Sequence, residues 1–226
     1  MTKAIRIGIV DSGVHAGHPH VGGIAGGVTV EADRYLPDYV DRLGHGTAIA
    51  ALIRALAPSA ELLSVRVFDR SLATSIHRVI RAIDWCLENE IQIVNLSLGT
   101  VNPDHRAVFE AAVERVRNAG AALVSAFEMN GQPMLPGCMS GVIGVTADPD
   151  CPREEYRCLE RDGKQVYSAS PYPLEIPGVR RERNLNGVSF AVAHISAHIA
   201  QRRLSYGPDA DWQDILAGGA SVSQSV

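Results

Sequence analysis

Apolar segments of strand length alternate with helical segments along most of the sequence. The near-continuous apolar runs cover residues 5–10, 61–68, 91–98, 121–127 and 141–147. Strands that read as unbroken apolar runs are normally covered on both faces of a sheet. Strands that alternate with helices join in parallel, since each parallel connection needs a crossover. The pattern therefore predicts an α/β fold with a mostly parallel central sheet and helices on both faces, in three layers.

The segments between these runs carry helical periodicity. Residues 74–90 and 104–120 each place their apolar side chains on one stripe of a helix. Gly120 ends the second of these helices, as a glycine at a helix stop does. The stripe residues are Ile76, Val79, Ile80, Ile83 and Leu87 in the first helix and Phe109, Val113 and Val116 in the second.

Size and charge limit the classes of function that fit the chain. The 226 residues, 46% of them hydrophobic, suit a single domain over 1–226. The net charge is only -4 and no long run of one sign occurs, so we expect no nucleic-acid and no membrane partner. The charged segment 148–164 interrupts the pattern. We interpret it as an insertion loop, either simply exposed or in contact with a partner.

The cysteines and the amino terminus indicate a cytoplasmic protein. Cys86, Cys138, Cys151 and Cys158 form neither a CxxC pair nor a dense framework, so we expect reduced thiols. The spacing of Cys151 and Cys158 also allows a disulfide or a metal site, but no matching ligand pair accompanies them. The chain enters its first predicted strand without the zones of a secretory signal.

Three polar residues stand where a parallel sheet places its ligand site, outside the carboxyl ends of the strands. Asp11 follows the first strand, His45 lies between Gly44 and Gly46, and Ser189 opens the last long helix. A serine hydroxyl becomes a nucleophile when an imidazole takes its proton and a carboxylate orients that imidazole. These residues are therefore candidates for nucleophilic acyl transfer.

Each candidate also has a simpler interpretation. Asp11 alone fits a turn or cap residue, His45 a loop residue, and Ser189 an N-terminal helix cap. His15, His18 and His20 suggest a metal cluster, but no carboxylate or cysteine completes it in the sequence. We therefore predict no required metal and no cofactor.

Four segments together resemble the landmarks of the subtilisin-like serine peptidases, the subtilases of peptidase family S8. They are IVDSGV around Asp11, LGHGTAIA around His45, IVNLSLG at 93–99 and NGVSFA around Ser189, in the family's order. The resemblance implies that Asp11 is the orienting acid, His45 the general base and Ser189 the nucleophile.

The same resemblance implies further roles. Ser97, Leu98 and Gly99 correspond to the strand edge and pocket wall that hold the substrate backbone extended. Residues 174–179, LEIPGV, correspond to the stretch that precedes the nucleophile helix.

The segment VSAFEMNG departs from the Ala-Ala-Gly-Asn with which the family usually supplies an oxyanion amide. Alignment without gaps puts Met129 at the asparagine position and Asn130 one residue later. A one-residue adjustment of the loop makes Asn130 the donor, and we take it as the provisional oxyanion residue. Otherwise the hole relies on the backbone N–H of Ser189 and on whatever replaces the amide. Glu128 opposes an oxyanion if it points inward.

The resemblance implies a serine endopeptidase that forms an acyl-enzyme on a peptide or protein substrate. A compact chain with neither signal peptide nor prodomain is either specific for one partner, restrained by an inhibitory or regulatory protein, or inactive. In its small size, this chain resembles the dedicated intracellular subtilases that remove leader peptides. Two alternatives stay open: a non-catalytic module that binds peptides by strand addition along 95–99, and a peptide cyclase or ligase.

Overall fold

The fold is built on one sheet of ten strands. The structure is a computed structural model that describes residues 4–207 and 210–222. The strands are β1 (Arg6–Asp11), β2 (Gly26–Val30), β3 (Tyr35–Leu36), β4 (Glu61–Arg66), β5 (Ile93–Leu96), β6 (Ala122–Ala126), β9 (Ile143–Ala147), β10 (Arg157–Arg161), β11 (Lys164–Ala169) and β12 (Ser221–Val222). Their order across the sheet is β12-β10-β11-β9-β6-β5-β1-β4-β2-β3.

Most neighbouring strands of this sheet pair in parallel, and the β2–β3 and β10–β11 pairs are antiparallel. β1 lies between β4 and β5, with Val10 opposite Val65 on one side and Leu96 on the other. Asp11 and the residue after β5, Ser97, therefore leave the sheet at the same edge. A separate hairpin of β7 (Glu128–Met129) and β8 (Gln132–Pro133) follows β6.

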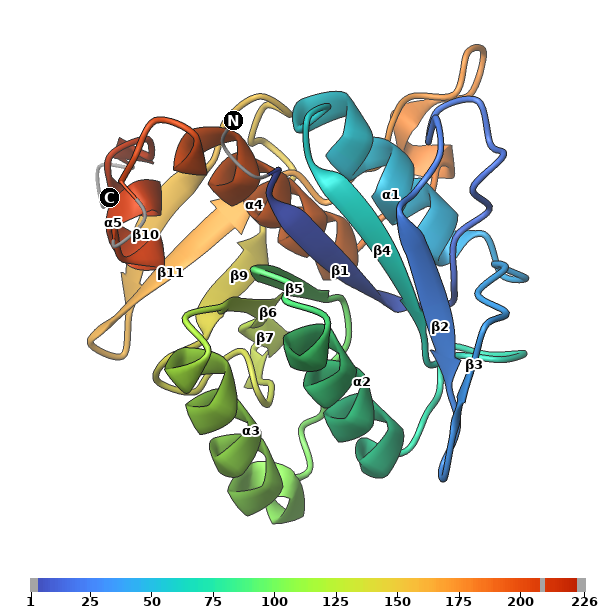
Figure 1. The fold of residues 1–226 in the computed structure, drawn as a ribbon. Helices are drawn as coiled ribbons and strands as arrows, with labels where there is room; N and C mark the ends of the chain where they lie inside the picture. Colours follow the sequence, from blue (N-terminus) through green and yellow to red (C-terminus); the bar gives the residue numbers. More distant parts are fainter. Residues whose placement is uncertain (1–3, 208–209, 223–226) are drawn as a thin grey trace.

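Helices cover both faces of the sheet (Figure 1). They are α1 (His45–Leu56), α2 (Ile76–Glu88), α3 (Arg106–Asn118), α4 (Val188–Arg203) and α5 (Trp212–Ala217). α1 and α4 pack together on one face, and α2 and α3 pack on the other. This arrangement confirms the predicted three-layer α/β fold, and the five strands predicted from apolar runs are β1, β4, β5, β6 and β9.

Two apolar cores lie on the two sides of the sheet. Side chains of β1 alternate between them, since Ile7 and Ile9 join the core under α1 and α4 while Val10 joins the core under α2 and α3. A Cβ on Gly8 would stand 2.9 Å from the sulfur of Cys86 on α2, so this close approach requires glycine.

The structure corrects the prediction for residues 148–164. Part of this segment is not a loop, because it forms β10 and pairs antiparallel with β11. Asp162 and Gly163 join the two strands with φ of 51° and 71°, the positive angles that an Asp-Gly hairpin turn requires. An ion pair between Arg157 and Asp148 ties the segment together.

Two histidines of α4 are buried, and their burial makes the fold sensitive to acid. His194 is fully buried and His198 is 6% exposed. Burial lowers the pKa of each imidazole to about 4. A histidine in the unfolded chain has a pKa of about 6.5. The unfolded state therefore binds more protons between these values, and protonation favours unfolding.

We expect the contribution of these two histidines to the free energy of unfolding to be constant above about pH 6.5 and to fall as the pH drops toward 4, by up to ~1.4 kcal/mol per pH unit for each histidine. Urea unfolding of the wild type and His198→Leu across this range measures the slope. The variant should show a shallower slope, and the matched change of the exposed His77→Leu should not. Equal slopes in all three proteins would contradict the assignment.

Candidate active site

The three predicted catalytic residues lie at one edge of the sheet. Asp11 is the last residue of β1, His45 is the first residue of α1, and Ser189 is the second residue of α4. α1 and α4 both begin at the carboxyl edge of the sheet and pack on one of its faces. The ring of Phe190 lies 5.4 Å from the ring of His45, centroid to centroid, so the first turn of α4 contacts His45.

A short hydrogen bond joins His45 to Asp11. His45 Nδ1 lies 2.7 Å from Oδ1 of Asp11, and that oxygen also accepts the backbone N–H of Ser12 at 2.7 Å. The Asp11 side chain is fully buried and the His45 side chain is 15% exposed. Because Nδ1 is held by the carboxylate, Nε2 is the ring nitrogen that can accept a proton from a substrate or a hydroxyl.

The charges around His45 raise its pKa. Burial acts against the charged ring and lowers the pKa, but the hydrogen bond to Asp11 and the negative charges of Asp11 and Asp41 outweigh it. The stability that the charged ring contributes is therefore present below the ordinary histidine pKa and is lost as the pH rises through the raised value. The neutral ring, which a general base needs, predominates above that raised value.

Asp41 holds the start of α1 in place, and the sequence analysis missed it. Its Oδ1 accepts the Ser12 hydroxyl at 2.9 Å, and its Oδ2 accepts the N–H and the hydroxyl of Thr47 at 2.9 and 2.6 Å. The backbone N–H groups of Leu43 and Gly44 also donate to Oδ1. Burial raises the pKa of the Asp41 carboxyl, but these hydrogen bonds together lower it below its usual value. An aspartate four residues before the histidine in DRLGHGT is the sequence signal that could have identified it.

Ser189 does not cap its helix. The N-cap of α4 is Gly187, with φ of 153°, and no side-chain cap bond forms there. Ser189 Oγ instead donates to the backbone carbonyl of Ser97 at 3.1 Å. No hydrogen bond joins Ser189 to His45 among the described residues, so the hydroxyl must turn away from Ser97 before the imidazole can take its proton. Catalytic hydrogen bonds are often absent before substrate binds.

A buried polar chain fixes α4 against β5. Asn95 is fully buried, and its Nδ2 donates to Ser97 Oγ at 2.7 Å. Its Oδ1 accepts the hydroxyl of Ser196, on α4, at 3.0 Å. Both polar groups of the amide are therefore satisfied in the core, and the register of α4 places Ser189 beside the carbonyl of Ser97.

The predicted substrate strand, residues 97–99, continues into a bridge between Thr100 and Leu135. Thr100 N–H donates to the Leu135 carbonyl at 2.9 Å, and Leu135 N–H donates back at 2.8 Å. A Cβ on Gly99 would stand 2.7 Å from the Leu135 carbonyl, so this approach requires glycine. Leu98 and Gly99 line a cavity of about 230 Å³ that extends over the first turn of α2 to Phe109.

The residues after β6 form a hairpin turn. Asn130 and Gly131 have φ of 53° and 76°, the positive values of a two-residue Asn-Gly turn between β7 and β8. Asn130 is exposed and Met129 is 50% exposed, whereas Glu128 is half-buried. The turn alone thus gives Asn130 a structural reason to be asparagine.

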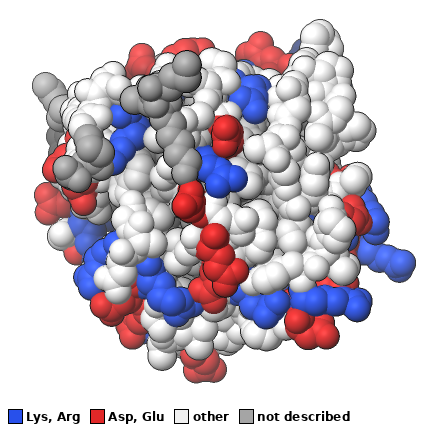
Figure 2. Space-filling view, viewed as in Figure 1, with Lys and Arg blue, Asp and Glu red and all other residues white. Residues whose placement is uncertain are grey.

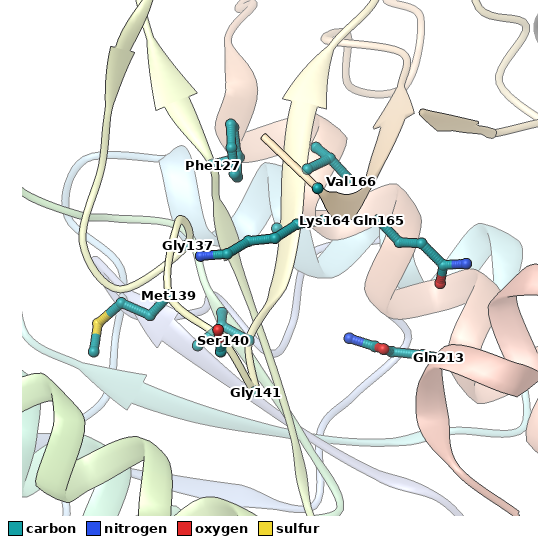
Figure 3. Close-up of a pocket in the computed structure, with 12 residues that line it drawn as sticks. Phe127, Gly137, Met139, Ser140, Gly141, Lys164, Gln165, Val166 and Gln213 are labelled. Atoms are coloured by element: carbon teal, nitrogen blue, oxygen red, sulfur yellow. The ribbon is translucent and has the colours of Figure 1, made fainter. Parts of the chain in front are cut away.

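A cavity of about 350 Å³ opens between the loop 137–141 and β11 and contains none of the predicted site residues (Figure 3). Lys164 reaches across it and donates to the Cys138 carbonyl at 2.7 Å.

The described residues also bear on the predictions about metals and membranes. Within residues 4–207 and 210–222, no three histidine, cysteine or acidic side chains come together as a metal site, and this includes His15, His18 and His20. No described helix is long and apolar enough to cross a membrane. Basic and acidic side chains are interspersed on the face seen in Figure 2.

The chain is similar to known proteins in sequence and in fold. A family model described as the Subtilase family matches residues 2–216. The chain is 33% identical to a thermostable alkaline protease of Halalkalibacterium halodurans over 89% of its length and 57% of the relative. It is 31% identical to the minor extracellular protease Epr of Bacillus subtilis over 75% of its length and 27% of the relative. The chain therefore spans about half or less of these relatives. The crystal structure of a lanthipeptide protease has a TM-score of 0.72 at 16% identity, covering 93% of this chain and 77% of that one.

The raised pKa of His45 leads to a prediction about pH. We expect kcat/KM to rise with pH along a limb whose pKa lies above the ordinary value for histidine, because the base must be neutral. Asp41→Asn removes one of the charges that raise the pKa and should move this limb to lower pH. Measurement of kcat/KM from pH 5 to 10 tests this, with the nearby Asp38→Asn as a control of equal charge change. An unmoved limb in Asp41→Asn, or an equal shift in both variants, would show that Asp41 has only a structural role.

Proposed function

Because the chain belongs to the Subtilase family, we propose that it is a serine endopeptidase that cleaves peptide or protein substrates through an acyl-enzyme. The observation that carries the proposal is the buried 2.7 Å hydrogen bond from His45 to Asp11, at the edge where Ser189 opens α4. This pair supplies an oriented general base beside a serine hydroxyl, which is the minimum requirement for nucleophilic acyl transfer.

The first half of the reaction follows from these positions. Ser189 Oγ turns from the Ser97 carbonyl to His45, loses its proton to Nε2 and forms a bond to the substrate carbonyl carbon. The oxygen of the tetrahedral intermediate gains its charge near the first turn of α4, where unpaired N–H groups and the helix dipole stabilise it. His45 then returns the proton to the leaving nitrogen as the peptide bond breaks.

In the second half, water attacks the acyl-enzyme and His45 again takes the proton. The ester bond to Ser189 breaks, the acid product leaves, and the hydroxyl regains its hydrogen. We assign the acyl part of the substrate to residues 97–99 as an added strand, since they continue directly from the end of β5 at the carboxyl edge of the sheet.

For the physiological substrate we propose one dedicated precursor peptide. The fold resembles that of a protein described as a lanthipeptide protease, which supports a processing role. The net charge of -4 provides no strong field for a highly charged substrate, so selection must depend on contacts along the groove.

Labelling with a fluorophosphonate tests the nucleophile. We expect a single adduct by intact mass on the wild type and none on Ser189→Ala, with unchanged circular dichroism, because the substitution removes only the hydroxyl at a half-buried position. Ser140→Ala, at an exposed serine beside the 350 Å³ cavity, should still be labelled. A wild type that stays unlabelled would instead favour the peptide-binding module.

The oxyanion assignment has a separate test. If Asn130 donates to the oxyanion, Asn130→Gly should lower kcat by roughly a hundred- to a thousandfold with little change in KM. Glycine accepts the positive φ of the turn, so the hairpin remains and the amide alone is lost. Met129→Gly, one residue earlier, is the control and should leave kcat largely intact. Full activity in Asn130→Gly would assign the oxyanion to the backbone N–H groups at the start of α4.

A further inference from the structure

Asparagine is followed by glycine at two places in the sequence, at residues 130–131 and at residues 186–187. The first pair forms the turn between β7 and β8, and the second leads directly into α4. Asn130 and Asn186 are both exposed. Asparagine is thermolabile in proteins. A following glycine increases this lability, because no side chain keeps the glycine nitrogen away from the asparagine side chain. The reactivity of each pair therefore depends on how the fold holds the glycine nitrogen.

The fold holds the nitrogen of Gly187 in place. Its N–H donates to the Pro171 carbonyl at 2.9 Å, and its carbonyl accepts the N–H of Phe190 at 3.1 Å. The side-chain amide of Asn186 is also engaged, since it donates to the Asn184 carbonyl at 3.4 Å. The Gly187 nitrogen must therefore break a hydrogen bond at the start of a long helix before it can approach the Asn186 side chain.

The nitrogen of Gly131 has no such restraint. Among the residues that the structure describes, none accepts a hydrogen bond from its N–H. Asn130 and Gly131 are both exposed at the tip of the turn. The hairpin below them has two residues in each strand, and one of these is Pro133, which has no N–H to donate. The turn can therefore change its backbone angles with the loss of few hydrogen bonds.

We propose that Asn130 is a site of spontaneous deamidation in the folded protein, and that the fold protects Asn186 from the same reaction. The backbone nitrogen of Gly131 attacks Cγ of Asn130. The N–Cγ bond forms, the Cγ–Nδ2 bond breaks, and ammonia leaves with the proton of the Gly131 N–H. Water then opens the cyclic imide. Opening at Cγ gives aspartate, and opening at the main-chain carbonyl gives isoaspartate, so water is the only co-reactant and no electron is transferred.

The consequence for catalysis rests on the proposed endopeptidase function, with Asn130 as the oxyanion donor. Both products replace the Nδ2 donor by a carboxylate, which places negative charge where the oxyanion needs a hydrogen bond. Glu128, which is half-buried in the same hairpin, already supplies one carboxylate there. Isoaspartate also adds a carbon to the backbone of the turn and so moves the carboxylate. The folded enzyme therefore loses turnover as it ages, while its fold is retained.

Ageing of the Ser189→Ala variant at mildly alkaline pH tests the modification without any need for activity, and the variant cannot cut itself. In water enriched in heavy oxygen, peptide mapping should find labelled aspartate and isoaspartate at residue 130. Asn186 should react about tenfold more slowly, since its attacking nitrogen donates a hydrogen bond. In urea both asparagines should react at similar rates. Equal rates in the folded protein, or an Asn130 that stays an amide there, overturns the proposal.

A second measurement tests the consequence. The aged wild type is separated by anion exchange, and the deamidated fraction should have a kcat lower by roughly a hundred- to a thousandfold. Fresh Asn130→Asp should reproduce this loss. Asn118→Asp, which adds the same charge at the exposed end of α3, should keep its kcat. Full kcat in the deamidated fraction overturns the loss of turnover. Failure of the proposed function is distinguishable, because neither fraction would then turn over a peptide while the mass change remained.

Discussion

The buried hydrogen bond between Asp11 and His45 is the interaction on which the arrangement of the site depends. It joins the end of the central strand to the start of a helix that packs on that strand. A fully buried carboxylate is costly unless donors satisfy it, and here the imidazole and the N–H of Ser12 both donate to Oδ1, while Oδ2 has no hydrogen-bond partner among the described residues. The site therefore requires α1 to begin at His45. Asp41 fixes this start, because its carboxylate accepts hydrogen bonds from the backbone N–H groups of Gly44, before His45, and Thr47, after it.

Ser189, the proposed nucleophile, is placed by an independent set of contacts. Asn95 and Ser196 connect β5 to α4 through the core, and the carbonyl of Ser97 holds the hydroxyl of Ser189. Two packed pairs, β1 with α1 and β5 with α4, thus carry the proposed base and the proposed nucleophile, and the parallel pairing of β1 with β5 joins them. The catalytic geometry is set by elements of secondary structure, while the departure from the family's Ala-Ala-Gly-Asn lies in the loop after β6.

The sequence predicts the central strands and the packed helices because burial on both faces produces continuous apolar runs and stripes. It does not predict β2, which starts with Gly26 and Gly27, or α5, which is a six-residue helix, since neither is long enough to show a period. β10 carries three charged residues in RCLER, so its composition indicates a loop, and the Asp162-Gly163 turn was the available signal. Asp11, His45 and Ser189 are predicted from motifs, whereas Asp41 acts through local hydrogen bonds that a motif does not display.

Asn130 shows why the oxyanion donor is harder to assign than the other site residues. Asparagine suits this position for two reasons. It tolerates the positive φ at the first position of a hairpin turn, and its side-chain amide is the type of donor proposed for the oxyanion. A backbone that holds Asn130 at the exposed tip accounts for the first reason by itself. The second reason needs the amide to reach the start of α4, a distance that the rigid elements do not set. With Asn130 as the proposed donor, stabilisation of the oxyanion would depend on the conformation of a two-residue turn, while His45 and Ser189 are positioned by helices that pack on the sheet.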